Sequence, residues 1–313
     1  MKRTLALCVT IAVGGGCKGK QPETSTPGSA HASGVATEAG SAGSDGSAAV
    51  PVPAGSAATM PPAERAKLVL EAQVAALKAG ADDKLAATFD SSAVVLARVG
   101  YALNESDLAK QVASINPHDT IKDIKVTKTA VGGNADAVWF VAELAITKDV
   151  AEPESKPETR TETVRASELL TASSQWKVVA AAFSQPRELR KSRPIAAMPG
   201  ASAPGALSGL LADPTKAAAS LSTDPAVAAI GVGENDFATG SDAAKKILET
   251  FKDKTITADS VREVRDAKWG FVQATLESPP DKGSNPYRFT GQLIAIPNPD
   301  GTWQVVAVHY LGL

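Results

Sequence analysis

The sequence is poor in cysteine and histidine, and each scarcity limits the chemistry available. Among 313 residues there are two cysteines and three histidines. Cys8 lies in the apolar part of an N-terminal leader and Cys17 closes that leader, so the folded part of the chain is expected to hold no cysteine. Disulfide bonds, a cysteine-based zinc site and a cysteine nucleophile are therefore excluded there. His31, His118 and His309 lie in three different regions, so we predict neither a metal site nor a cofactor.

The chain also has no large excess of charge of one sign, and it has few aromatic residues. The formal net charge is −2, without the basic face that nucleic-acid binding needs, so no nucleic acid is expected as a partner. Aromatic residues make up 4% of the chain against 43% hydrophobic residues, which are mainly Ala and Val. Such cores gain less burial per residue than cores rich in Leu or Phe. Gly231 and Gly233 lack the third glycine and the Lys-Ser/Thr pair of a phosphate loop, so they predict a turn.

Residues 1–17 predict a secretory leader that ends at a lipidated cysteine. Lys2 and Arg3 precede an apolar stretch, residues 4–13, which is too short to span a bilayer. Three glycines and then Cys17 follow. This pattern resembles a bacterial lipoprotein signal, which implies a lipid anchor at Cys17 and a place in the bacterial cell envelope, facing the periplasm or the exterior. An ordinary cleaved secretory signal is the alternative, since Gly14 stands where the motif usually has an aliphatic residue.

The rest of the chain divides into a tether and two folded segments. Residues 18–60 are rich in Gly, Ser, Ala and Pro without an apolar period, which predicts a disordered linker that lifts the protein from a membrane surface. Residues 61–185 and 205–313 have the periodic apolar pattern of folded domains. Residues 186–204 join them as a second linker.

The two folded segments resemble each other, which predicts one domain built twice. All four tryptophans fall inside the correspondence. The matching stretches are residues 106–112 with 241–247, residues 136–139 with 266–269, and residues 176–183 with 303–310.

Each segment predicts helices followed by a run of antiparallel strands, an α+β pattern. In the first, helices are predicted over 63–79, over 82–89 and from an N-cap at Asn104 to Pro117, with strands over 93–99, 121–131, 136–147, 161–170 and 175–185. In the second, helices are predicted over 206–211, over 215–221 and from an N-cap at Thr239 to Phe251, with strands over 226–232, 257–264, 268–277, 287–296 and 302–311. Asp300 and Gly301 predict a hairpin turn.

This order, ending in a Trp followed by Val-Val-Ala and then an aromatic residue, resembles the SnoaL-like branch of the nuclear transport factor two-like superfamily over residues 63–185 and 206–312. The resemblance implies two tandem cone-shaped domains, each with helices on a curved antiparallel sheet. It also implies that the interior of the cone can serve as a pocket for catalysis or binding.

The period of two in strands places certain side chains on the same face as the tryptophans. If these faces point inward, the candidate pocket residues are Trp139, Glu143, Trp176, Trp269, Gln273, Trp303 and His309. His309 is the candidate for acid–base work because its ordinary pKa is near neutrality, but no carboxylate is spaced to assist it, and a structural role is the alternative. Glu143 is either a pocket acid or one member of a salt bridge with Arg165 or Lys177.

Two main functions stay open. The first is a non-enzymatic, membrane-tethered protein that binds a small apolar molecule or an envelope protein. The alternative is a SnoaL-like isomerase, cyclase or hydrolase that uses a cavity residue such as His309. No histidine–carboxylate pair is common to both copies, which favours the first. A rigid spacer, in which each copy only packs against the other, is a third possibility.

Overall fold

The computed structural model describes residues 60–96, 120–150, 158–172, 175–186, 200–279 and 286–312, which belong to one compact unit. The predicted leader with Cys17, the tether, the helix that begins at Asn104, His31, His118 and most of the linker between the segments lie outside these residues. Within the described residues, no helix combines the length and the apolar character needed to cross a bilayer.

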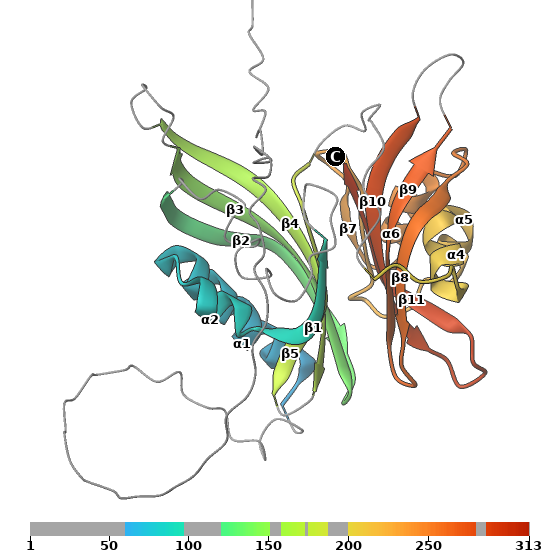
Figure 1. The fold of residues 1–313 in the computed structure, drawn as a ribbon, viewed down its shortest axis with the longest axis horizontal. Coiled ribbons are helices and arrows are strands. Elements are labelled where there is room, and N and C mark those ends of the chain that lie inside the picture. Colours follow the sequence, from blue (N-terminus) through green and yellow to red (C-terminus); the bar gives the residue numbers. More distant parts are fainter. Residues whose placement is uncertain are drawn as a thin grey trace, which may run out of the picture. The chain divides into compact units, whose positions relative to one another are not determined.

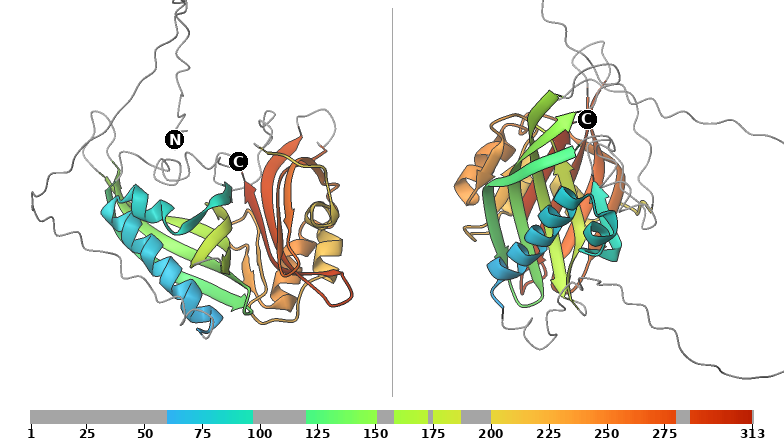
Figure 2. Two further views of the ribbon diagram at one scale, coloured as in Figure 1. Left: turned by 60° about the horizontal axis from the view of Figure 1, so that its bottom comes forward. Right: turned by 90° about the vertical axis from the view of Figure 1, so that its left-hand side faces the viewer.

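The first segment forms a five-stranded sheet, called here the first sheet (Figure 1). Its strand order is β1-β5-β4-β3-β2, with β1 parallel to β5 and all other pairs antiparallel. One helix, α1, runs across one face of this sheet (Figure 2). The elements are α1 (Pro62–Ala79), α2 (Asp82–Ala86), β1 (Phe89–Leu96), β2 (Thr120–Gly133), β3 (Ala137–Val150), β4 (Glu158–Ala172) and β5 (Trp176–Ser184).

The second segment forms a six-stranded sheet, called here the second sheet, with the same order and one extra edge strand. The order is β7-β6-β11-β10-β9-β8, and β6 is parallel to β11 as β1 is to β5. The elements are α4 (Ala206–Ala212), α5 (Pro214–Ala219), β6 (Ala228–Ile230), β7 (Phe237–Thr239), α6 (Ser241–Glu249), β8 (Thr257–Arg265), β9 (Gly270–Ser278), β10 (Tyr287–Pro297) and β11 (Trp303–Gly312).

The α+β class predicted from the sequence is confirmed, with helices on one face of each sheet. Three local predictions differ from the structure. The helix predicted over 82–89 ends at Ala86, and β1 begins at Phe89, ahead of the strand predicted over 93–99. The strand β7 was missed because three residues are too few to show a period. The N-cap of α6 is Gly240, not Thr239, and no side chain caps this helix. Gly240 has φ 82°, and its N–H donates to the carbonyl of Val227, so the chain enters α6 through a left-handed glycine that ties the helix to the loop before β6.

A β-bulge recurs at the same place in both sheets. In β5, Leu169 and Leu170 of β4 pair with Ala180 and Val178, so Val179 is the extra residue. In β11, the extra residue is Val306, because Ile294 and Ala295 of β10 pair with Ala307 and Val305. Each extra residue lies three positions after the tryptophan that opens its strand. Without a bulge, strand residues an even number of positions apart point to the same face. Because the bulge inserts one residue, two such residues on either side of it point to opposite faces.

Each sheet therefore has two buried faces of different kinds. On the first sheet, Phe140, Leu170 and Ala181 pack under α1, and this surface is called here the helix-covered face. On the opposite face, Trp139 and Leu169 belong to a core cluster that also contains side chains of the second sheet.

Candidate functional site

The sheet faces that carry no helix meet in a layer of buried polar side chains, called here the inter-sheet seam. All but one of its members are at most 1% exposed, and Ser184 is 5% exposed. The first sheet contributes Arg165, Ser167 and Ser184, and the second contributes Gln273, Gln292 and His309. Buried polar groups cost free energy unless they are hydrogen-bonded. The contacts of these side chains therefore decide whether they only hold the sheets together or are available to react with a substrate.

His309 is held by two serines of the first sheet. Its Nδ1 lies 3.0 Å from Ser167 Oγ and its Nε2 lies 2.7 Å from Ser184 Oγ. Complete burial, with the positive charge of Arg165 nearby, lowers the pKa of His309 to about 3. The ring is therefore neutral near pH 7, donating from one nitrogen and accepting at the other. Both nitrogens are used, so neither is free to move a proton of a substrate.

Beside His309, two glutamines of the second sheet contact three strands of the first sheet, β1, β5 and β4. Gln273 Nε2 donates to Gln292 Oε1 at 2.6 Å, to the Ala181 carbonyl at 3.0 Å and to the Val94 carbonyl at 3.2 Å. Gln292 Nε2 donates to the carbonyl and to Oγ of Ser167, each at 2.9 Å. Gln292 stands directly between Gln273 and His309 in the sheet register. The sequence placed Gln273 and His309 on one face, and they do share it, but that face is covered by the first sheet.

Arg165 is the charged member of the seam. Its Nε donates to Glu143 Oε2 at 3.1 Å, and its guanidinium donates to the carbonyls of Gly233, at 2.7 Å, and Glu234 in the turn between β6 and β7. Burial acts to raise the pKa of Glu143, but hydrogen bonds from Lys128 and Arg165 outweigh it and hold that pKa below its usual value. Glu143 is thus an ionised salt-bridge partner of Arg165, the second of the two roles that the sequence left open for it.

The four tryptophans divide between the two kinds of face. Trp139 is in the core cluster between the sheets, and its indole lies over Gly132, which leaves no room there for a Cβ atom. Trp269 stacks on Phe271 with ring centroids 6.3 Å apart.

The other two tryptophans, which precede the bulges, lie on the helix side. Trp176 lies on the helix-covered face, with the Arg65 guanidinium carbon 4.3 Å from its ring centroid. Trp303 adjoins Leu207 of α4 at Gly270. The seven predicted residues do not form one pocket, because a bulge separates Trp303 from His309 and because the seam is filled by the partner sheet.

The helix side of the second sheet is filled with aromatic side chains. Phe251, Phe289 and Tyr310 pack with ring centroids 4.8 to 6.3 Å apart, and all three are at most 3% exposed. Tyr310 Oη donates to the Leu211 carbonyl at 2.9 Å, which satisfies its hydroxyl. This interior is therefore a packed aromatic core in which the Tyr310 hydroxyl is hydrogen-bonded.

The helix-covered face of the first sheet differs, because it contains a carboxyl group that the sequence reasoning missed. Glu168 of β4 is completely buried, and its Oε2 accepts a hydrogen bond from Gln73 Nε2 of α1 at 3.0 Å. Its Oε1 is buried without a hydrogen-bond partner. Burial raises the pKa of Glu168 to about 8, against which the Gln73 bond acts only partly. The available signal was a lone acid within the otherwise uncharged stretch 166–172.

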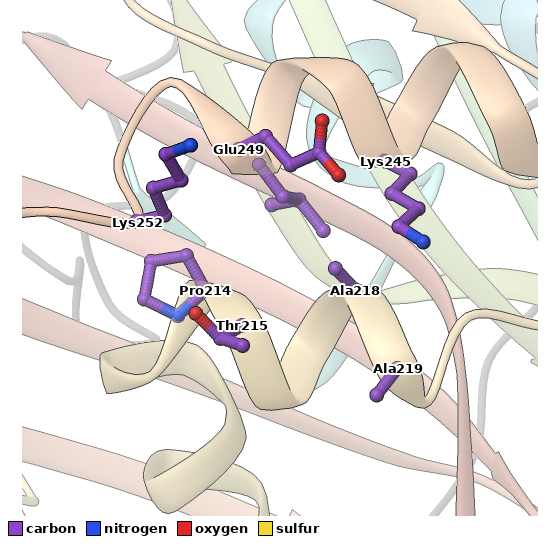
Figure 3. Close-up of a pocket in the computed structure, with 8 residues that line it drawn as sticks. Pro214, Thr215, Ala218, Ala219, Lys245, Glu249 and Lys252 are labelled. Atoms are coloured by element: carbon purple, nitrogen blue, oxygen red, sulfur yellow. The ribbon is translucent and has the colours of Figure 1, made fainter.

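An open groove lies between α5 and α6 on the second segment (Figure 3). Its volume is about 260 Å³, just under the range of about 300–1,000 Å³ that small-molecule sites usually have. Lys245, Glu249 and Lys252 line the α6 side, with Glu249 between the two lysines, so no single charge dominates. Within the described ranges, no three His, Cys, Asp or Glu residues are grouped to hold a metal ion.

Comparisons with known proteins returned structural likeness only. No protein-family model matches the chain. No curated protein matches it either. Among solved structures, it is similar to an NTF2-like protein from Cytophaga hutchinsonii, with 14% identity over 40% of this chain and 99% of that one, and a TM-score of 0.34. A ketosteroid isomerase-like protein from Erwinia carotovora atroseptica gives 14% identity over 40% and 96%, with a TM-score of 0.34. An NTF2-like protein of unknown function in nutrient uptake from Rhodospirillum rubrum gives 16% identity over 38% and 96%, with a TM-score of 0.32.

Proposed function

We propose that this chain is a non-catalytic binding protein of the bacterial cell envelope, tethered to a membrane through Cys17 and carrying two SnoaL-like units in tandem. The ligand is a small, mostly apolar molecule or another envelope protein. One observation carries the non-catalytic assignment: both ring nitrogens of His309 are held by serines within a fully buried seam. The one histidine among the described residues is thereby committed to joining the two sheets.

The alternative, a SnoaL-like isomerase, cyclase or hydrolase acting through His309, requires this side chain to reach a substrate. The first sheet covers it, and its lowered pKa keeps it neutral and weakly basic. The rigid-spacer possibility has support in the seam, which fixes the two sheets to each other. It leaves unexplained the buried carboxyl of Glu168, which makes no contribution to that seam.

The tether is tested by fractionation of cells that express the full chain or Cys17→Ser. We expect the wild-type protein in the membrane fraction, with mass spectrometry showing an acylated N-terminal cysteine. The Cys17→Ser protein is expected to lose the acyl mass and leave the membrane fraction. A wild-type protein cleaved elsewhere, with no acyl group, would contradict the anchor.

Binding is tested by native mass spectrometry of the full chain purified from its own membranes. A non-covalent molecule or a second protein that remains at gentle activation and leaves at higher energy supports the proposal. Turnover of a co-purified molecule by the wild-type protein, abolished in His309→Gln, would favour the enzyme instead.

A further inference from the structure

Among the described residues, two large apolar side chains are strongly exposed, and one of them lies on α1. Leu68 and Val126 are each 44% exposed. Leu68 lies on the outer surface of α1 beside three exposed charged residues, Glu64, Lys67 and Glu71. Lys67 and Glu71 form an ion pair of 3.8 Å whose side chains are 71% and 61% exposed, so the pair contributes little to stability and can exchange partners. The outer surface of α1 thus offers an apolar side chain within a row of alternating charges.

The groove between α5 and α6 has the complementary character. Ala218 of α5 and the buried Leu248 of α6 belong to its apolar lining (Figure 3). Lys245, Glu249 and Lys252 follow one another along its α6 side, and none of the three has an ion-pair partner in the part of the chain that the structure describes. Lys252 lies in the turn after α6, where its N–H donates to the Glu249 carbonyl at 3.2 Å and continues the helical path. The groove therefore presents unpaired charges beside an apolar floor.

The two surfaces match in sign and in spacing. On α1 and on α6 alike, three charges and one leucine follow the spacing i, i+3, i+4, i+7, which places each set on one face of its helix. In an antiparallel arrangement, the two glutamates of α1 meet the two lysines of the groove, and Lys67 meets Glu249. The same register places Leu68 opposite Leu248. A parallel arrangement would instead place Leu68 opposite Glu249 and Lys67 opposite Leu248.

The α1 surface cannot reach the groove of its own molecule. α1 lies on the helix-covered face of the first sheet, and the other face of that sheet meets the second sheet through the inter-sheet seam. The helices α5 and α6 lie on the far side of the second sheet. Two sheets thus separate Leu68 from the groove, so only a second molecule can bring the two surfaces together.

We propose that α1 of one molecule packs antiparallel against the α5–α6 groove of a second copy of this chain, with Leu68 over the apolar floor. This inference goes beyond the proposed function and does not depend on the anchor at Cys17. The contact joins two different surfaces, so a pair of molecules keeps one α1 and one groove available for further copies. Repetition gives a head-to-tail row or a closed ring. Because one helix in one groove is a small interface, each contact is weak.

Sedimentation velocity of the detergent-solubilised full chain over a concentration series tests this contact. We expect the wild type to associate as its concentration rises. Two charge reversals, Glu64→Lys with Glu71→Lys on α1 and Lys245→Glu with Lys252→Glu in the groove, should each weaken association by about ten-fold or more, because two attractions become repulsions. Lys246→Glu, exposed on α6 outside the groove, is the matched control and should associate like the wild type.

Mixing the two charge-reversed proteins gives a readout that a misfolded variant would not produce. In the mixture, α1 of each protein is complementary in charge to the groove of the other, so association should return to the wild-type level. A second pair of variants tests the apolar part. Leu68→Ser should weaken association, whereas Val126→Ser, at the other strongly exposed apolar position, should not.

A wild-type protein that stays monomeric throughout the concentration series overturns the inference. Association that survives either charge reversal or Leu68→Ser also overturns it, as does a mixture that fails to restore association. A micelle that merely held two anchored chains together would hold the wild type and the variants alike, and so would be recognised. The Cys17 fractionation bears on the proposed anchor alone.

Discussion

Two buried ionisable side chains have pKa values displaced in opposite directions for the same reason. Burial disfavours the charged form of both, so it lowers the pKa of His309 to about 3 and raises that of Glu168 to about 8. Both groups are therefore neutral in the folded protein near neutral pH, and between pH 4.5 and 6.5 both become charged on unfolding. Each makes the free energy of unfolding depend on pH, with opposite sign.

The sign for each group follows from its shift. Stability from neutral His309 is complete above its unfolded pKa of 6.5 and is lost as the pH falls towards 3. Stability from protonated Glu168 is complete below its unfolded pKa of 4.5 and is lost as the pH rises through about 8. Each slope is about 1.4 kcal/mol per pH unit, so the two cancel between pH 4.5 and 6.5. We expect a stability plateau in that window, with a fall on both sides.

Urea unfolding across this pH range measures the profile. Glu168→Leu should abolish the fall between pH 6.5 and 8, and His309→Gln should reduce the fall below pH 4.5. Carboxylates with a lowered pKa, such as Asp213, also lose stabilising interactions at low pH. They contribute to the loss of stability there in the wild type and in the variants. A variant profile that parallels the wild type above pH 6.5 would show that Glu168 is ionised in the folded protein.

At the scale of single elements, glycines decide how closely α4 approaches the second sheet. A Cβ atom on Gly270 would lie 2.9 Å from Leu207 and 3.0 Å from Trp303, and one on Gly291 would lie 2.9 Å from Leu276 and 3.1 Å from Leu211. Gly209, within α4 itself, has open space around its Cβ position. The strand glycines thus permit close packing, whereas the helix glycine only weakens its helix.

Opposite effects of the same substitution are therefore expected. Gly270→Ala should destabilise the protein by about 1–3 kcal/mol through overpacking. Gly209→Ala should stabilise it by about 0.5–1 kcal/mol, because alanine has the higher helix propensity. Thermal unfolding of the two variants beside the wild type measures both changes. Equal stability of the two variants would show that α4 can move away from the sheet at little cost.

At the scale of the whole molecule, the seam makes the two sheets one body. Arg165 is the centre of this attachment, since its guanidinium joins Glu143 of its own sheet to the backbone of the β6–β7 turn. From the second sheet, Gln273 hydrogen-bonds to the Ala181 carbonyl and His309 hydrogen-bonds to Ser167. Unfolding of one sheet would leave these polar groups of the other exposed to water or unpaired, which favours a single cooperative transition.

Removal of the guanidinium should disturb both sheets together. We expect Arg165→Leu to lower the free energy of unfolding by about 3–5 kcal/mol, because Glu143 and the turn carbonyls lose a buried charged partner. Hydrogen exchange should then increase in β4 and in β6 alike. Arg160→Leu, exposed on the same strand, is the control and should change little. Faster exchange confined to the first sheet would contradict the common seam.

The sequence by itself predicted most of the described helices and strands in their order, because the apolar period and the turn residues are local signals, but it missed the short strand β7. Alternation along neighbouring strands was also enough to name Arg165 as one of two possible partners of Glu143, and the structure shows that it is the partner. Tertiary structure decided which face each candidate residue occupies. The bulges at Val179 and Val306 reverse the alternation without any change in composition, and the bulge at Val306 separates Trp303 from His309. Only the docking of one sheet on the other makes His309 a buried structural group, and only the packing of α1 on the first sheet buries Glu168, since burial depends on residues far away in the chain.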